Sequence, residues 1–164
     1  MRKLIATVLL LSMGLFAETP AGLDPAKDLV KHASTIPYTG RPIMLMFDSK
    51  TCPYCKKTRK DLATNTYLNS VAVHFDIYNI PRDEPQPYTI LGNGTTLQSL
   101  QMLYKVKVTP NIVLLTSHGE KIWQIPGYTK PEVLGKIMEF VQGVDKGTYK
   151  KAEWKDYLRK NGII

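Results

Sequence analysis

The sequence predicts a single α/β domain built on a mixed β-sheet with helices on its faces. The five apolar residues at 43–47 are typical of a strand that is covered on both sides. Segments with helical spacing separate this run from two later strand candidates, 71–78 and 111–116, as expected for parallel strands joined by helices. A short turn at 117–120 follows the last of these strands and indicates an antiparallel hairpin at the end of the sheet.

Local patterns predict the elements of the first half in turn. Asp24 before Pro25 is typical of a helix start, and we expect this N-terminal helix to run through Val30 and His32. A turn-rich connector leads to the strand at 43–47, and a helix follows it. We predict helices at 56–68 and 95–106 from their helical spacing of apolar residues. Between them we predict a strand at 71–78 from its period of two, and a loop at 79–94 from its prolines and glycines.

The second half continues the same order of elements. Strand 111–116 and its return strand 121–125 form the hairpin. Thr129-Lys130-Pro131-Glu132 is typical of a helix start, with proline in the first turn. A C-terminal helical extension over 148–160 offers four packing residues, Tyr149, Trp154, Tyr157 and Leu158.

The first residues are typical of a secretory signal peptide. Met1-Arg2-Lys3 is basic, an uncharged apolar run follows, and Ala17 is a small residue suited to cleavage. The run is shorter than the ~20 residues that a spanning helix needs. We therefore expect a signal peptide at 1–17, a domain at 18–146 and an extension at 147–164 packed on it; an uncleaved N-terminal anchor is the alternative.

The charge of the chain is basic, with a formal net charge of +8 over 164 residues. A basic surface is compatible with nucleic-acid binding. The lysines are scattered among acidic residues, however, and the protein is predicted to be exported. We expect a solvated basic surface and no nucleic-acid partner.

The chain has two cysteines, and both lie in Cys52-Pro53-Tyr54-Cys55. A structural zinc site takes four ligands, and the three histidines are widely separated, so we predict no metal and no cofactor. A disulfide across so short a loop restrains little of the unfolded chain, which argues against a structural staple. The remaining use is a redox pair that opens and closes a disulfide.

The position of this pair favours a reactive thiolate. If Cys52 caps the helix that follows, the free N–H groups and the helix dipole stabilise its anion. Pro53 suits the first turn because it has no N–H to leave unpaired. We predict that Cys52 attacks and that Cys55, nearly one turn on, resolves the mixed disulfide, with positive charge added by Lys50, Lys56 and Lys57.

The order of motifs resembles the thioredoxin superfamily. A strand precedes Cys-Pro-Tyr-Cys, Val108-Thr109-Pro110 precedes another strand, and Pro126-Gly127-Tyr128 precedes the final helix. The resemblance covers roughly 42–142, and the tail is similar to that of the exported SoxW-like thioredoxins. It implies a thioredoxin fold in which Pro110 is cis beside the cysteines and the backbone of Thr109 pairs with an extended substrate chain.

Several residues depart from the thioredoxin pattern. Thr51 precedes Cys52, and the Pro-Tyr dipeptide is that of glutaredoxins, although the tail does not resemble one. Met46 stands where thioredoxin has the buried aspartate that helps to deprotonate the resolving thiol. The candidates for that proton acceptor are Asp48, Asp76, a lysine or water.

Other residues have simpler interpretations. We place Pro53 and Tyr54 in the substrate-binding surface, where Tyr54 either contacts substrates or shields the disulfide. Met44 and Met46 are core residues rather than copper ligands. Trp123 and Trp154 are packing residues.

The leading hypothesis is a periplasmic thiol–disulfide oxidoreductase that works on exported proteins. The resemblance implies reduction by a membrane electron donor of the DsbD or CcdA type. Thr109 resembles the residue of DsbC isomerases, whereas DsbA oxidants usually carry valine, so we favour reductase or isomerase work. We expect a monomer. The alternative is a non-catalytic binding module or chaperone for an exported apoprotein.

Overall fold

The computed structural model describes residues 29–164. The predicted signal peptide and the predicted start of the N-terminal helix lie outside the described residues. Within them, no helix has both the length and the apolar composition needed to span a bilayer.

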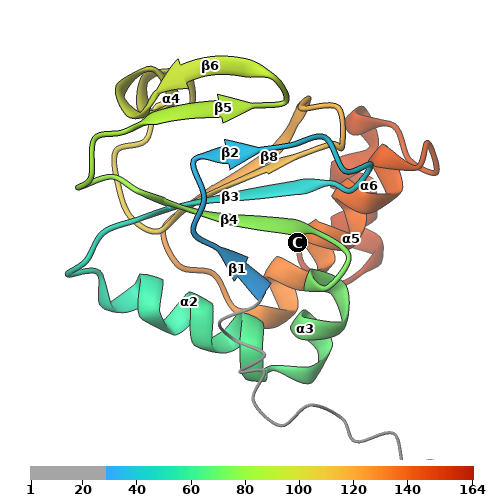
Figure 1. Ribbon diagram of the computed structural model, residues 1–164. Helices are drawn as coiled ribbons and strands as arrows, with labels where there is room; N and C mark the ends of the chain where they lie inside the picture. Colours follow the sequence, from blue (N-terminus) through green and yellow to red (C-terminus); the bar gives the residue numbers. More distant parts are fainter. Residues whose placement is uncertain (1–28) are drawn as a thin grey trace, which may run out of the picture.

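A five-stranded mixed sheet lies at the centre of the domain (Figure 1). Its strand order is β1-β4-β3-β7-β8, with the bounds Val30–Lys31, Asp76–Pro81, Ile43–Asp48, Asn111–Leu115 and Lys121–Pro126. The first three strands run parallel, and β7 and β8 are antiparallel to their neighbours. The mixed sheet and its terminal hairpin confirm the predicted fold class.

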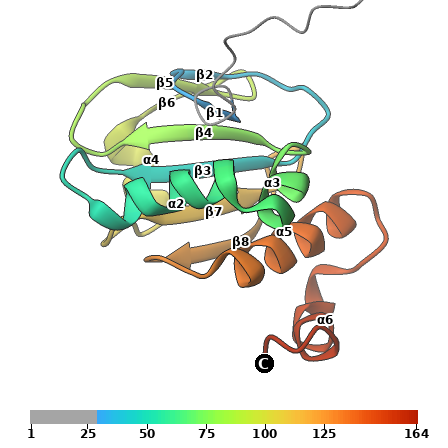
Figure 2. The same cartoon turned by 90° about the horizontal axis from the view of Figure 1, so that it is seen from below.

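Strand β3 is buried along its whole length because both faces of the sheet are covered. Met44 and Met46 point to one face, and Ile43, Leu45 and Phe47 point to the other. The first face packs against helices α2, α3 and α5, which lie side by side in Figure 2, with the bounds Pro53–Thr64, Thr66–Ala72 and Pro131–Asp145. The predicted core role of both methionines is confirmed.

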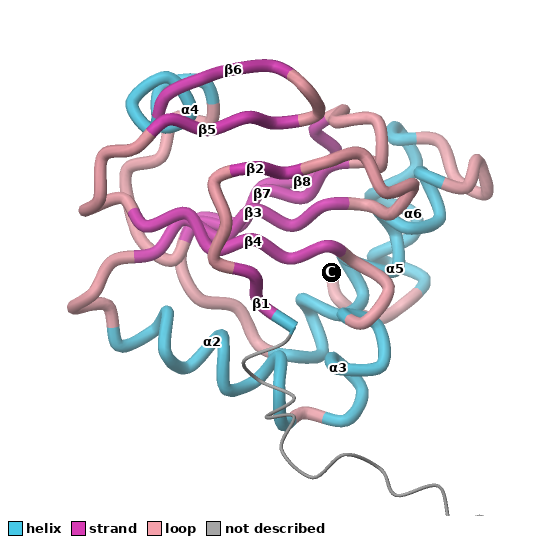
Figure 3. The backbone as a smooth tube through the Cα atoms, viewed as in Figure 1, coloured by secondary structure: helices cyan, strands magenta, loops and turns pink. Residues whose placement is uncertain are grey.

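A second, three-stranded sheet covers the other face together with helix α4 (Leu97–Leu103). Its order is β2-β5-β6, with the bounds Thr35–Ile36, Pro87–Ile90 and Asn93–Thr96. The prediction of a loop at 79–94 was therefore wrong, as Figure 3 shows by the strand segments in this region. Leu91 and Gly92 both have positive φ (50° and 84°), as the tight turn of such a hairpin requires.

Two bounds around the helices also differ from the prediction. Val30 was expected in a helix, but it pairs in parallel with Ile77 at the edge of the sheet, where a β-branched residue fits well. The predicted strand start at Val71 was wrong, because Val71 packs with Leu68 at helical spacing inside α3. Asn65 has extended backbone that ends α2, and its side chain caps α3 by accepting from the Leu68 N–H. The single helix predicted at 56–68 is therefore divided into α2 and α3 at this residue.

The end of the chain packs on the domain. Helix α5 begins at Pro131 as predicted, and a 3₁₀ turn (Lys151–Glu153) leads to α6 (Trp154–Lys160). Leu158 is buried in the same core cluster as α5. Trp123 and Trp154 meet edge to face, with ring centroids 5.2 Å apart, which confirms them as packing residues.

Candidate functional site

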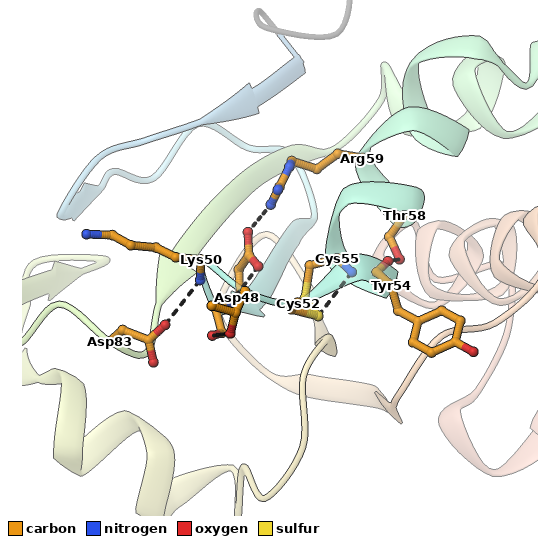
Figure 4. The surroundings of a disulfide bond; sticks show 10 residues. Asp48, Lys50, Cys52, Tyr54, Cys55, Thr58, Arg59 and Asp83 are labelled. Atoms are coloured by element: carbon orange, nitrogen blue, oxygen red, sulfur yellow. Dashed lines mark hydrogen bonds and ion pairs between the residues drawn. A yellow bond between two sulfur atoms is a disulfide. The ribbon is translucent and has the colours of Figure 1, made fainter.

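Cys52 and Cys55 form a disulfide at the N-terminus of α2 (Figure 4). Cys52 has extended backbone and is the N-cap residue, and its sulfur accepts a hydrogen bond from the Cys55 N–H at 3.1 Å. Pro53 is the first helical residue, where a missing N–H costs nothing. The local sequence therefore places the Cys52 sulfur where the free N–H groups and the helix dipole favour a thiolate.

The two sulfurs differ in accessibility. Cys52 is 8% exposed and Cys55 is fully buried. A reacting partner can therefore reach Cys52 before Cys55. This difference matches the predicted order, with Cys52 as the attacking and Cys55 as the resolving cysteine.

Thr109 and Pro110 lie beside the end of β3 from which the loop to the disulfide starts. The peptide bond between them is cis. Pro110 directly precedes β7, whose first residue, Asn111, pairs with Phe47 at the end of β3. Pro110 is buried and Thr109 is half-buried, so the sheet register brings this turn next to the loop that carries Cys52.

An aromatic pair borders the other side of the disulfide. The Tyr54 side chain points away from Asp48 (Figure 4) and is 58% exposed. Its ring stacks on that of Tyr128, with centroids 5.7 Å apart. The Tyr128 hydroxyl donates to Asp61 at 2.8 Å, which fixes the ring on α2. Tyr54 is thus an exposed surface beside Cys52 rather than a lid that buries it.

A partly buried ion pair lies behind the disulfide. Asp48, at the end of β3, is 5% exposed and binds the Arg59 guanidinium, which reaches over from α2. The Ser49 N–H also donates to this carboxylate, at 2.5 Å. Burial lowers the pKa of Arg59, yet a guanidinium stays charged throughout the physiological range. One carboxylate oxygen of Asp48 lies within 4.8 Å of both cysteine sulfurs.

The predicted lysines contribute less charge to the sulfurs than the sequence suggested. Lys50 binds Glu84 at 2.9 Å, and Lys57 binds Asp61 at 2.9 Å, so acidic partners offset both. The hydrogen bond to Glu84 raises the pKa of Lys50. Lys56 is exposed. Arg59, which was not predicted as a site residue, places a positive charge on the carboxylate beside the sulfurs.

The comparisons with known proteins agree with this geometry. The family model described as a thioredoxin-like domain matches residues 29–142. The chain belongs to the thioredoxin-like family. No curated protein matches the sequence at a significant level.

Solved structures share the fold of this thioredoxin-like protein at low identity. A thioredoxin-fold protein from Helicobacter pylori superposes with a TM-score of 0.72 at 21% identity, covering 82% of this chain and 92% of that one. A thioredoxin-like protein from Clostridium perfringens gives 0.55 at 20% identity, covering 77% and 91%. A thioredoxin from Thermus thermophilus gives 0.52 at 20% identity, covering 71% and 93%.

One cluster of possible metal ligands occurs among residues 29–164, and it consists of Asp48, Cys52 and Cys55. It offers three ligand atoms, one fewer than a structural zinc site takes. Both sulfurs are joined to each other, and Arg59 already binds the carboxylate. In this oxidised form the cluster is a thiol–disulfide site with a neighbouring acid.

A polar pocket of about 410 Å³ adjoins Asp48 on the side away from Tyr54. Asp48, Arg59 and Asn79 line it, with the exposed His32 and Lys50 among its other walls. Asn79 is 6% exposed, and its Oδ1 has no hydrogen-bond partner among the described residues. Asn79 was not predicted as a site residue, because its position in β4 was predicted to be a loop.

Proposed function

We propose that this thioredoxin-like protein is a thiol–disulfide oxidoreductase that exchanges disulfides with protein substrates. The observation that carries the proposal is the unequal burial of the Cys52–Cys55 disulfide at the N-terminus of α2. A structural staple needs no reachable sulfur and gains little from a loop this short. A redox pair needs one sulfur that partners can reach and a second that they cannot.

The reaction runs through two exchanges. The Cys52 thiolate attacks one sulfur of the substrate disulfide, and the other substrate sulfur leaves as a thiolate that takes up a proton. Cys55, as a thiolate, then attacks the Cys52 sulfur and breaks the mixed disulfide. The second substrate sulfur leaves and is protonated. The substrate gains two electrons and two protons, and Cys52 and Cys55 end as a disulfide.

The surface around Cys52 supports binding of an extended protein chain. The Thr109–Pro110 turn lies on one side of the disulfide, and Pro53 and Tyr54 lie in the first turn of α2. Free backbone groups at such a turn pair with an extended chain by strand addition. The exposed Tyr54 ring offers an apolar contact to side chains near the target disulfide.

The proposed setting is the periplasm, and the proposed direction is reduction or isomerisation. The basic and apolar start of the sequence supports export. Thr109 and the SoxW-like tail support work as a reductase or isomerase, with exported proteins as substrates and a DsbD- or CcdA-type membrane donor. A strongly oxidising reduction potential, with the pair found as a disulfide in the cell, would contradict this direction.

Insulin reduction tests the proposed function directly. The reduced native protein should accelerate insulin disulfide reduction, and Cys52→Ser should abolish the acceleration. Cys55→Ser should instead accumulate mixed disulfides on Cys52, which mass spectrometry of trapped complexes from cells would identify. Equal activity of the native protein and Cys52→Ser would favour a non-catalytic binding module and sink the proposal.

A further inference from the structure

We infer that Asp48 is the proton acceptor for Cys55, and that the polar pocket behind Asp48 carries the proton to solvent. This inference rests on the proposed function, because it concerns the second exchange step. That step needs a thiolate from Cys55, which is fully buried. Burial in apolar surroundings disfavours a thiolate, so a nearby base is needed at neutral pH.

Asp48 has the position that this role requires. Its carboxylate oxygen lies within 4.8 Å of the sulfurs of both Cys52 and Cys55. A base transfers a proton directly at about 3 Å or through one water, and such distances are often longer before the reacting complex forms. Asp48 needs only a small shift, or one water molecule, to reach the Cys55 thiol.

Arg59 is a positioning residue in this arrangement. It binds one carboxylate oxygen of Asp48, and the Ser49 N–H donates to the other. These two donors hold the side chain beside the disulfide and compensate the cost of burying its charge. The other charged or titratable groups around the pocket are His32, Lys50 and Glu84, and Lys50 and Glu84 bind each other.

The pocket gives the proton a way out. Its volume of about 410 Å³ is large enough for several waters, and its walls are polar. Asn79 adds a polar side chain to the wall of this pocket and is itself 6% exposed.

The other candidate acceptors are less suitable. Asp76 pairs with Ile43, at the opposite end of β3 from Asp48, so it lies roughly 17 Å away along the strand. Lys31, Thr39 and Arg41 bind its carboxylate there. Lys50 and Lys57 are held by acidic partners at the surface.

The proton balance of the step is then complete. The Cys55 S–H gives its proton to Asp48 as its sulfur attacks Cys52. Asp48 passes that proton to water in the pocket and returns to its ionised form. The departing substrate thiolate takes a proton from solvent. No further oxidant or reductant enters.

Single-turnover kinetics with Asp48→Asn test the inference. The reduced protein is mixed with a model peptide disulfide, and the Cys52 mixed disulfide and its decay are followed by acid quench. An unassisted thiol with a pKa of ~8.5 is only about 3% ionised at pH 7, and burial lowers that fraction further. Decay of the mixed disulfide should therefore slow about 30-fold or more at pH 7 and recover toward the native rate at alkaline pH, while its formation changes little.

Two matched variants serve as further tests. Asp83→Asn removes a nearby carboxylate that accepts from the Lys50 N–H at the surface, and it should leave the decay rate unchanged. Asn79→Leu keeps the side-chain size and replaces a polar side chain in the pocket wall by an apolar one, so it should slow decay at pH 7. Arg59→Lys should alter the pH profile of decay and restore more of the native rate than Arg59→Gln.

The outcomes separate this inference from the proposed function. If no Cys52 mixed disulfide forms in the native protein, the proposed function fails and this inference with it. If it forms normally and Asp48→Asn slows decay by less than threefold, or by the same factor at every pH, only this inference fails. If Asp48→Asn does not fold, the pH dependence of the decay rate in the native protein tests the inference instead. A decay rate that rises tenfold per pH unit from pH 6 to 8 would show that Cys55 ionises without a base, and the inference would fail.

Discussion

Replacing Leu158 by alanine is expected to destabilise the whole domain, because the C-terminal helix contributes to its core. Leu158 is 4% exposed and belongs to the cluster formed by α5 and the central sheet. A buried Leu→Ala change costs about 2–5 kcal/mol, depending on how far the site can collapse. Helix α6 has seven residues near the end of the chain, so it can shift to fill part of the cavity. We expect a loss of about 2–3 kcal/mol in the free energy of unfolding.

Thermal and urea unfolding followed by circular dichroism measure this loss. For a domain of this size, the expected fall in Tm is about 6–12 °C. Leu103→Ala is the matched control, because Leu103 is 67% exposed on α4 and its truncation should cost less than about 0.5 kcal/mol. Equal stability of the two variants, or a separate early transition of the tail, would refute the reasoning and show that α6 is not part of the cooperative core.

Two further predictions concern stability. Burial raises the pKa of Asp76, but hydrogen bonds from Lys31 and Thr39 outweigh it and hold that pKa below its usual value. The ionised Asp76 therefore stabilises the folded state above pH ~4, and this stabilisation is lost as pH falls through its folded-state pKa. Asp76→Asn should destabilise at pH 7 and should match the native protein near pH 2 in urea titrations; a constant gap would contradict this. Gly135→Ala should cost about 1–2 kcal/mol, because its Cβ would lie 2.5 Å from the Tyr67 ring, although alanine favours helix. Gly94→Ala, with open space around it, should be near neutral in the same melts, and equal effects would contradict the packing argument.

Local signals were sufficient for much of the fold and for the redox pair. The apolar run of β3 needs both faces covered, whatever covers them. Pro131 and its neighbours specify the start of α5 without help from distant residues. The same holds for Cys52 and Pro53, whose cap geometry follows from the two residues themselves.

Elements that depend on distant partners could not be read from local patterns. Val71 and Val73 alternate like a strand, but Val73 is 45% exposed and Val71 packs within α3. Strand β5 contains a proline and β6 a glycine, which are typical of loops, and these strands are ordered because β5 pairs with both β6 and β2. Such pairing outweighs weak local preference.

The acid beside the cysteines is the part of the site that the sequence left open, and sheet geometry explains how Asp48 can supply it. Side chains two residues apart on a strand point to the same face. Asp48 therefore lies on the same side of β3 as Met46, one step nearer to the cysteine loop, and α2 packs over that side. At Met46 the strand is deep under the helix, where an apolar side chain completes the core. At Asp48 the first turns of α2 place both sulfurs within 4.8 Å of the carboxylate, and Arg59 binds it. A carboxylate displaced by one strand repeat thus keeps its access to the resolving thiol and gains a fixed counter-charge and a path to solvent.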